Sequence, residues 1–146
     1  MKDSSESPIV VLSSRLLAPF IQLFALYVIF HGHYSPGGGF QGGTMLAASI
    51  ILMRLAVGTN TGEIQFRRIW SSKLSAGGLS IYALAGLTAL IMGGNYLDYK
   101  FLPLYWLPEP EIRAMGILIV EIGVAVAVMA TLVSIYDDLL EEDKND

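Results

Sequence analysis

Few residues of this chain have side chains suited to proton or ion chemistry, and the clearest of them is Glu121. It stands inside the most apolar stretch of the sequence, eight residues after Arg113. Eight residues span ~12 Å along a helix axis, so if the stretch crosses a bilayer, Glu121 lies near its middle. A charge there costs about 2.5–3.5 kcal/mol and needs a partner or an aqueous cavity. No basic residue lies within one turn along the sequence, which makes Glu121 the main candidate for an ion pathway.

His31 and His33 are the only histidines and titrate near neutral pH. A spacing of two residues points their side chains to different faces of a helix, and no third ligand is near in the sequence, so we expect no metal site. A proton relay through either histidine stays open. The chain has no cysteine, which excludes disulfides, thiolate zinc sites and iron–sulfur clusters. Because no nucleophile, base and orienting group come together, we expect neither an enzyme nor a cofactor.

A glycine-rich segment, HGHYSPGGGFQGG, occupies residues 31–43. Its glycines form a formal G-x-G-x-x-G, but a dinucleotide fingerprint follows a strand and is answered by an acid about twenty residues later. Here residues 59–62 are Thr, Asn, Thr and Gly, and an apolar segment precedes the glycines. The pattern therefore argues against a nucleotide site.

The same segment favours a tight re-entrant turn between two helices. Gly32 can end the first helix and Pro36 can fix the turn. Gly39, Gly43 and Ala47 recur every four residues and predict a close-packing face on the second helix. The alternative is that irregular backbone at this depth lines a wet cavity and meets an ion.

Four apolar segments must position these groups. They cover residues 9–30, 40–57, 74–92 and 114–136. Each is near the ~20 residues that a helix needs to cross a ~30 Å hydrocarbon core, and the whole chain has 53% apolar residues, 15% charged residues and a mean hydropathy of +0.56. We predict one all-α domain, a polytopic membrane protein with four transmembrane helices.

Charge at the segment ends predicts the orientation. The loop before the third segment holds Arg67, Arg68 and Lys73, whereas the opposite side has only Lys100 and Arg113. The positive-inside rule then places both termini in the cytoplasm. Residues 137–146 carry six acids and one lysine, and we expect them to form a solvated cytoplasmic tail.

Other polar residues interrupt the first two segments. Arg15, Pro19 and Gln22 share one face of the first helix. Arg15 either extends to the cytoplasmic surface or lies deeper among helices, and Gln22 is expected to bond to another helix. Arg54 is expected to extend to the cytoplasmic surface.

The fourth segment carries a seam of small residues on one face. Its members are Gly116, Gly123, Ala127, Ala130 and Ser134. Glu121 points roughly 140° away from the centre of this seam, at 100° per residue. Because both faces need protein neighbours, we predict that other proteins enclose this helix and that the chain has obligate partners.

The segment from 16 to 52, with its core GHYSPGGGFQGG, resembles the B subunit of Mrp-type (MnhB-like) multi-subunit sodium/proton antiporters. The resemblance extends to the length, the four-segment layout and the polar ends. The residues that match the family pattern are Gly32, His33, Pro36, Gly37, Gly38, Gly39, Phe40, Gly42 and Gly43. Glu121 is a candidate through burial alone and takes nothing from the resemblance.

The resemblance implies a place in a prokaryotic cell (inner) membrane beside partner subunits of the A, C, D, E, F and G types, with Na⁺ and H⁺ as transported ions and no nucleic acid. There the chain would be an accessory subunit that completes helix packing, and a share in the ion path is a further hypothesis. Related subunits occur in energy-converting membrane hydrogenases, so a redox-driven ion pump is the alternative host.

Overall fold

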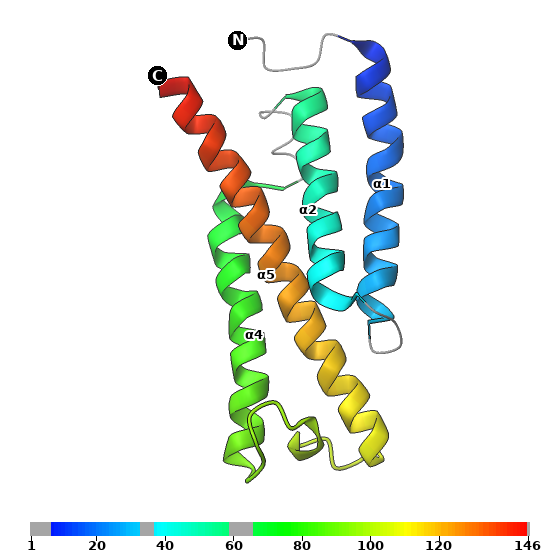
Figure 1. Cartoon of the computed structure of the whole chain (residues 1–146), viewed down its shortest axis with the longest axis vertical. Helices are drawn as coiled ribbons and strands as arrows, with labels where there is room; N and C mark the ends of the chain where they lie inside the picture. Colours follow the sequence, from blue (N-terminus) through cyan, green and yellow to red (C-terminus); the bar gives the residue numbers. More distant parts are fainter. Residues whose placement is uncertain (1–6, 33–36, 59–65, 146) are drawn as a thin grey trace.

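The structure is a computed structural model that describes residues 7–32, 37–58 and 66–145. Four long α-helices make up most of this part of the chain (Figure 1): α1 (Pro8–Phe30), α2 (Gly38–Val57), α4 (Ser71–Ile91) and α5 (Glu109–Asn145). Two short 3₁₀ helices, η1 (Arg68–Trp70) and η2 (Tyr99–Phe101), lie before α4 and before α5. The described ranges contain no strand, and the all-α prediction is confirmed.

Each of the four helices is long and apolar enough to cross a membrane. This confirms the predicted polytopic membrane protein with four transmembrane helices. The apolar segments recognised in the sequence fall within these helices, apart from Met92, which is the C-cap of α4. The last helix differs most from the expectation, because α5 runs unbroken from Glu109 through Asn145.

The helices stand side by side in the order α1, α2, α5, α4, as Figure 1 shows. Among the described residues α2 contacts α1 and α5, α4 contacts α5, and neither α1 nor α2 contacts α4. The helix that comes last in the sequence therefore lies between the second and the third. Along the helix axes, the start of α1 and the end of α5 lie at the same end of the molecule, at the top of Figure 1. The end of α1 and the start of α2 lie toward the opposite end.

Small residues hold the row together. In α1 the buried positions are Ser14, Ala18, Ala25 and Ile29, which recur at helical spacing and form one stripe. A Cβ atom at Gly42 of α2 would collide with Ile29 and with the Ala25 carbonyl, so α1 and α2 are in close backbone contact. Most other positions of α1 expose large apolar side chains, such as Leu12 and Phe20. This is the surface of a helix whose solvent is lipid or other helices.

The two halves of the row are offset along α5. The α1–α2 turn lies beside Glu121, which is more than three turns into α5 and therefore roughly 18 Å from its start. In Figure 1 the lower ends of α1 and α2 stop well short of the lower ends of α4 and α5. The described glycines at the two ends of the connection, Gly32 and Gly38, thus lie beside α5 well inside this apolar helix.

Candidate functional site

Three glycines at the two ends of the glycine-rich segment lie against Glu121. A Cβ atom at Gly32 or at Gly38 would collide with the Glu121 carboxyl group, and one at Gly39 would collide with the Glu121 main chain. One carboxylate oxygen, Oε2, is buried. The two strongest signals in the sequence, the glycine motif and the membrane-depth carboxylate, therefore form one site, which we call the glycine cradle (Gly32, Gly38, Gly39 and Glu121).

The carboxyl group of Glu121 lies at the N-terminus of α2. This helix starts at Gly38, and no side chain caps it. The chain enters it through positive φ angles of 146° at Gly37 and 69° at Gly38, which a residue with a Cβ atom rarely adopts. The first N–H groups of a helix have no partner within it, and the helix dipole stabilises an anion beside them. The Glu121 carboxyl group therefore lies where a helix N-terminus offers N–H donors.

The next turns of α2 continue the close contact. A Cβ atom at Gly43 would collide with the main chain of Ala125, and Ala47 is buried in a core cluster with Ile50 and Val133. The face predicted from Gly39, Gly43 and Ala47 is confirmed, and it packs on α5. The backbones of α2 and α5 touch along several turns, which fixes the position of Glu121 relative to the turn.

The opposite face of α5 packs on α4. Gly123 lies against the Gly78 carbonyl, and Gly78 lies against the main chain of Gly123 and Ala127. The predicted small-residue seam is therefore a helix contact within the chain. Both faces of α5 thus have neighbours within the chain, α2 on one and α4 on the other, so the contacts that we assigned to other proteins are supplied in part by this chain.

A tyrosine of the α4–α5 loop packs on α5 at a glycine that precedes Glu121. Tyr99 of η2 packs against Gly116, which has no side chain to obstruct it. Burial raises the pKa of the Tyr99 hydroxyl, and the charges of Tyr82 and Glu121 raise it further. Tyr99 therefore keeps its proton at neutral pH and remains a hydrogen-bond donor.

The side chains of the other predicted residues that the structure describes are exposed or lie on the buried stripe of α1. His31 is exposed, its Nδ1 lies 3.0 Å from the Tyr27 carbonyl oxygen, and its ring stacks on Tyr27 at 4.1 Å between centroids. Arg15 and Phe40 are exposed, whereas Gln22 is half-buried and lies on the stripe of α1 that faces α2. His33 and Pro36 lie outside the described residues.

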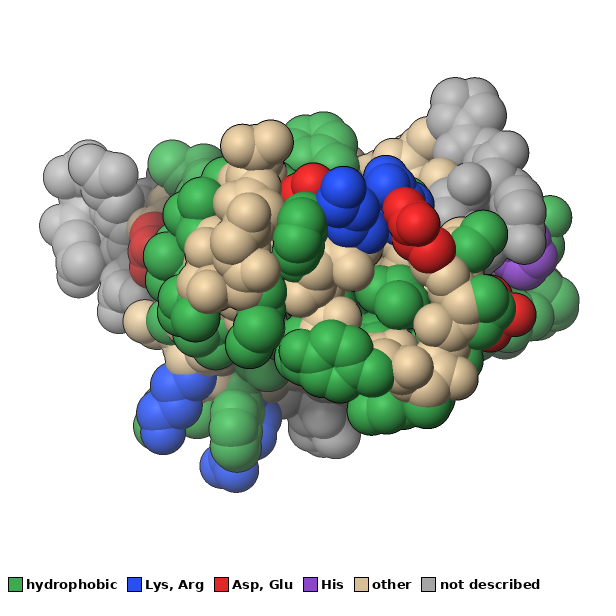
Figure 2. Space-filling model, turned by 90° about the horizontal axis from the view of Figure 1, so that it is seen from below, with side chains coloured by type: hydrophobic (Ala, Val, Ile, Leu, Met, Phe, Trp, Pro, Cys, Tyr) green, Lys and Arg blue, Asp and Glu red, His purple; other side chains and the backbone are tan. Residues whose placement is uncertain are grey.

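Figure 2 views the molecule from below the view of Figure 1, and basic and acidic side chains lie next to each other on that face. In the first turns of α5, the Nη2 atom of Arg113 and the Oε1 atom of Glu109 are 2.7 Å apart. In the described part of the chain, no three His, Asp or Glu side chains are grouped closely enough to hold a metal ion. The cradle thus has a single carboxylate that can bind a proton or take part in binding a small cation.

A buried ion pair at the other end of α2 was missed from the sequence. Arg54 donates to Asp137 of α5, and both residues are almost fully buried, with exposed fractions of 1% and 5%. Arg54 also donates from Nη2 to the Phe66 carbonyl oxygen at 2.6 Å. The expectation that Arg54 extends to the surface is wrong, because its guanidinium has buried partners.

The same pair corrects the prediction of a solvated tail that starts at residue 137. Asp137 is buried in the packed part of α5, whereas the next residue, Asp138, is exposed. The sequence contained a signal for this pair: Arg54 stands near the end of the second apolar segment, and Asp137 directly follows the fourth. In a chain with four membrane-spanning helices, these two segment ends lie on the same side of the membrane.

These features define a polytopic membrane protein whose helices enclose one carboxylate at membrane depth. The chain belongs to the family described as "Domain related to MnhB subunit of Na+/H+ antiporter", whose profile matches residues 9–134. This confirms the resemblance found in the sequence.

Individual relatives agree with the family. The chain is 34% identical over 128 residues to the B subunit of the Na(+)/H(+) antiporter of Alkalihalophilus pseudofirmus, covering 82% of this chain and 87% of that one. It is 28% identical over 127 residues to the B subunit of the Na(+)/H(+) antiporter of Bacillus subtilis, covering 82% and 88%. An uncharacterised protein of Methanocaldococcus jannaschii is 31% identical over 130 residues, 86% of this chain, and the chain spans only 49% of its length.

One solved structure has the same arrangement of helices. A chain of the membrane-bound sulfane sulfur reductase, an archaeal respiratory membrane complex, superimposes with a TM-score of 0.63 and 28% sequence identity. The match covers 96% of this chain and 60% of that chain.

Proposed function

We propose that this chain is an accessory integral membrane subunit of a multi-subunit antiporter that exchanges Na⁺ for H⁺. Its partners are other membrane subunits of the A, C, D, E, F and G types, in the cell membrane of a prokaryote. The chain contributes to assembly of the complex and to its ion pathway, and no catalytic group is assigned to it. Membership of the MnhB family and the antiporter names of its relatives support this interpretation.

The glycine cradle is the observation that carries the proposal. Placing a carboxylate among apolar helices is costly, and the chain surrounds it with glycines at Gly32, Gly38 and Gly39. A residue needed only for packing would be cheaper if it were apolar. A carboxylate that binds and releases a proton or a cation explains why this charge is present.

Replacing Glu121 with Gln tests the ion-pathway role. The substitution keeps the size of the side chain and removes its charge, so the complex should assemble while Na⁺-dependent proton transport falls by about tenfold or more. Transport is measured as decay of a pH gradient in inverted membrane vesicles after addition of NaCl, and assembly by co-purification of the subunits.

Glu111→Gln is the matched control, because Glu111 is exposed in the first turn of α5, and it should leave transport unchanged. Equal transport rates in Glu121→Gln and the native complex would reduce Glu121 to a packing residue. The assignment to an antiporter would then depend on the family alone.

We place both termini in the cytoplasm, since Arg67, Arg68 and Lys73 outnumber Lys100 and Arg113 on the opposite side. The absence of cysteine makes single-cysteine labelling direct. A maleimide that does not cross membranes should label Trp106→Cys in intact cells and Arg67→Cys only in inverted vesicles. Both positions are exposed. The reverse pattern would invert the topology.

A redox-driven ion pump is the second candidate for the host complex. It is supported by the superposition on a chain of a respiratory membrane complex. Purification of the complex in mild detergent, followed by mass spectrometry of its subunits, separates the two. Partners that carry iron–sulfur clusters would favour the redox-driven host, and a set of membrane subunits without redox centres would favour the antiporter.

A further inference from the structure

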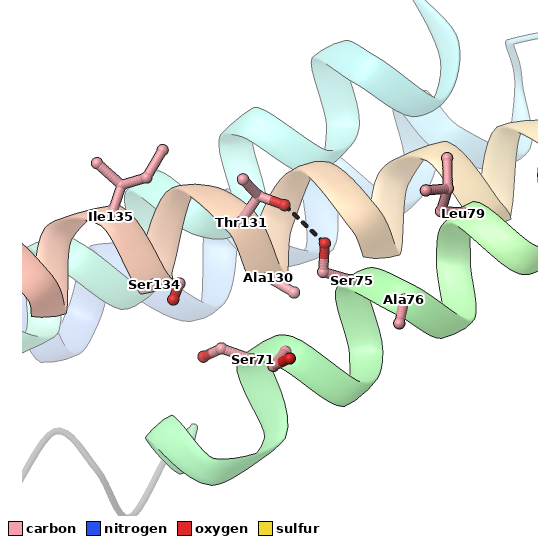
Figure 3. Close-up of a pocket in the computed structure, with 9 residues that line it drawn as sticks. Ser71, Ser75, Ala76, Leu79, Ala130, Thr131, Ser134 and Ile135 are labelled. Carbon is pink, nitrogen blue, oxygen red and sulfur yellow. Dashed lines mark hydrogen bonds between the residues drawn. The ribbon is translucent and has the colours of Figure 1, made fainter.

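A groove of about 390 Å³ lies between the first half of α4 and residues 130–135 of α5. Hydroxyl groups line much of it (Figure 3): Ser71, Ser72 and Ser75 from α4, and Thr131 and Ser134 from α5. The Ser75 and Thr131 hydroxyls lie 2.8 Å apart and bridge the two helices. The proposed function uses none of these residues.

The polar end of the groove is the start of α4. No side chain caps this helix, and its first turn contains no acid, so its first N–H groups and its dipole favour an anion. Ser71, the first residue of α4, is only 2% exposed, and its Oγ has no hydrogen-bond partner among the described residues. A buried hydroxyl without a partner is costly, and here it lies in the groove wall at the helix N-terminus.

The lining of the groove is mixed at the start of α4 and mostly apolar in the hollow that adjoins it. Ser71, Ser72, Ser134 and Ile135 line the end at the start of α4, and Ala76 and Ala130 lie beside the Ser75–Thr131 bridge. Leu79 also lines the adjoining hollow, together with Ala127, Val128 and Leu132. The start of a membrane-spanning helix lies at the level of the lipid headgroups. Trp70, which is half-exposed immediately before α4, is the kind of residue found at that level.

We infer that this groove binds one anionic phospholipid, with its phosphate at Ser71 and Ser134 and an acyl chain along Ala76 and Leu79. The helix N-terminus and the hydroxyls supply donors to the phosphate. The apolar depth of the groove suits a hydrocarbon chain better than it suits a free phosphate ion.

The surrounding charges fit this assignment. Arg67 and Lys73 are exposed on either side of the start of α4 in the sequence, and basic residues at the membrane surface attract anionic lipids. The two aspartates that follow Ser134 do not line the groove. Asp137 pairs with Arg54 on the far side of α5, toward α2.

Native mass spectrometry of the intact complex tests the inference. The complex is purified in mild detergent, and the phosphatidylglycerol that remains bound is counted while the detergent is supplemented with phosphatidylglycerol or phosphatidylcholine. The native complex should retain one phosphatidylglycerol more than the Ser71→Ala/Ser134→Ala variant does. The amount of phosphatidylglycerol needed for half-occupancy should rise about tenfold in the variant, since hydrogen bonds to a charged group are lost.

Ser80→Ala is the matched control, because the Ser80 hydroxyl donates to the Ala76 carbonyl of its own helix and does not line the groove. It should retain the lipid as the native complex does. Equal retention in the native complex and the double variant would overturn the inference, as would equal retention of phosphatidylcholine, displacement of the lipid by millimolar inorganic phosphate, or a helix of another subunit in the groove. A Leu79→Trp variant, which narrows the apolar part of the groove, should also reduce retention.

Discussion

The Asp137→Ala variant should lose about 3–5 kcal/mol of folding free energy, the cost of breaking a buried ion pair by removing one partner. Arg54 is 1% exposed, and the substitution leaves its charge buried between α2 and α5 without the carboxylate. We expect α2 to separate from α5 at this end. Reversible unfolding in mixed detergent micelles, followed by circular dichroism, measures the change.

Two further variants separate loss of the pair from loss of the aspartate alone. Arg54→Met/Asp137→Leu removes both charges and fills similar space, so most of the stability should return. Glu109→Ala breaks the exposed pair with Arg113 and should change stability little, since such pairs contribute little. A small effect of Asp137→Ala, similar to that of Glu109→Ala, would show that the pair does not hold α2 to α5.

The Gly39→Ala variant should be destabilised by about 1–3 kcal/mol, as is usual when a close contact is overpacked. A Cβ atom at Gly39 would collide with the main chain of Glu121. Main-chain atoms cannot change rotamer to make room as a flexible side chain can. We therefore expect α2 to move away from α5. Because that movement opens the glycine cradle, Na⁺-dependent proton transport should fall with stability.

Gly77→Ala provides the control on a membrane-spanning helix. Gly77 lies within α4, and a Cβ atom there meets no other atom within 4 Å. Alanine favours a helix over glycine by about 1 kcal/mol, so this variant should be as stable as the native chain or more so. If Gly39→Ala behaves as Gly77→Ala does, the contact between α2 and α5 is looser than described.

The fold was predictable because four apolar stretches of membrane-spanning length are a property of the sequence alone. Glu121 and the glycine motif were also found in the sequence, through the cost of a charge in lipid and the density of glycines. Their contact was not predictable, because the sequence does not say that α5 lies between α2 and α4. Without the helix order, the neighbours of the carboxylate were assigned to another protein.

The same lack of helix order explains the error at Arg54. A lone arginine near a helix end can reach the surface or pair with an acid, and only the position of α5 decides between them. Asp137 was assigned to a charged tail because five other acids follow it in the sequence. Composition treats residues 137–146 as one charged segment, and it fails at Asp137, which pairs with Arg54 of α2.

The single row of helices has a consequence for how the carboxylate is controlled. A layer one helix thick is only about 10–12 Å across, so nothing in this chain lies far from its two broad surfaces. Whatever lies against those surfaces, whether an acyl chain, a water molecule or a charged residue of another subunit, contributes to the local dielectric around Glu121. The surroundings of Glu121 are therefore completed partly by molecules outside the chain.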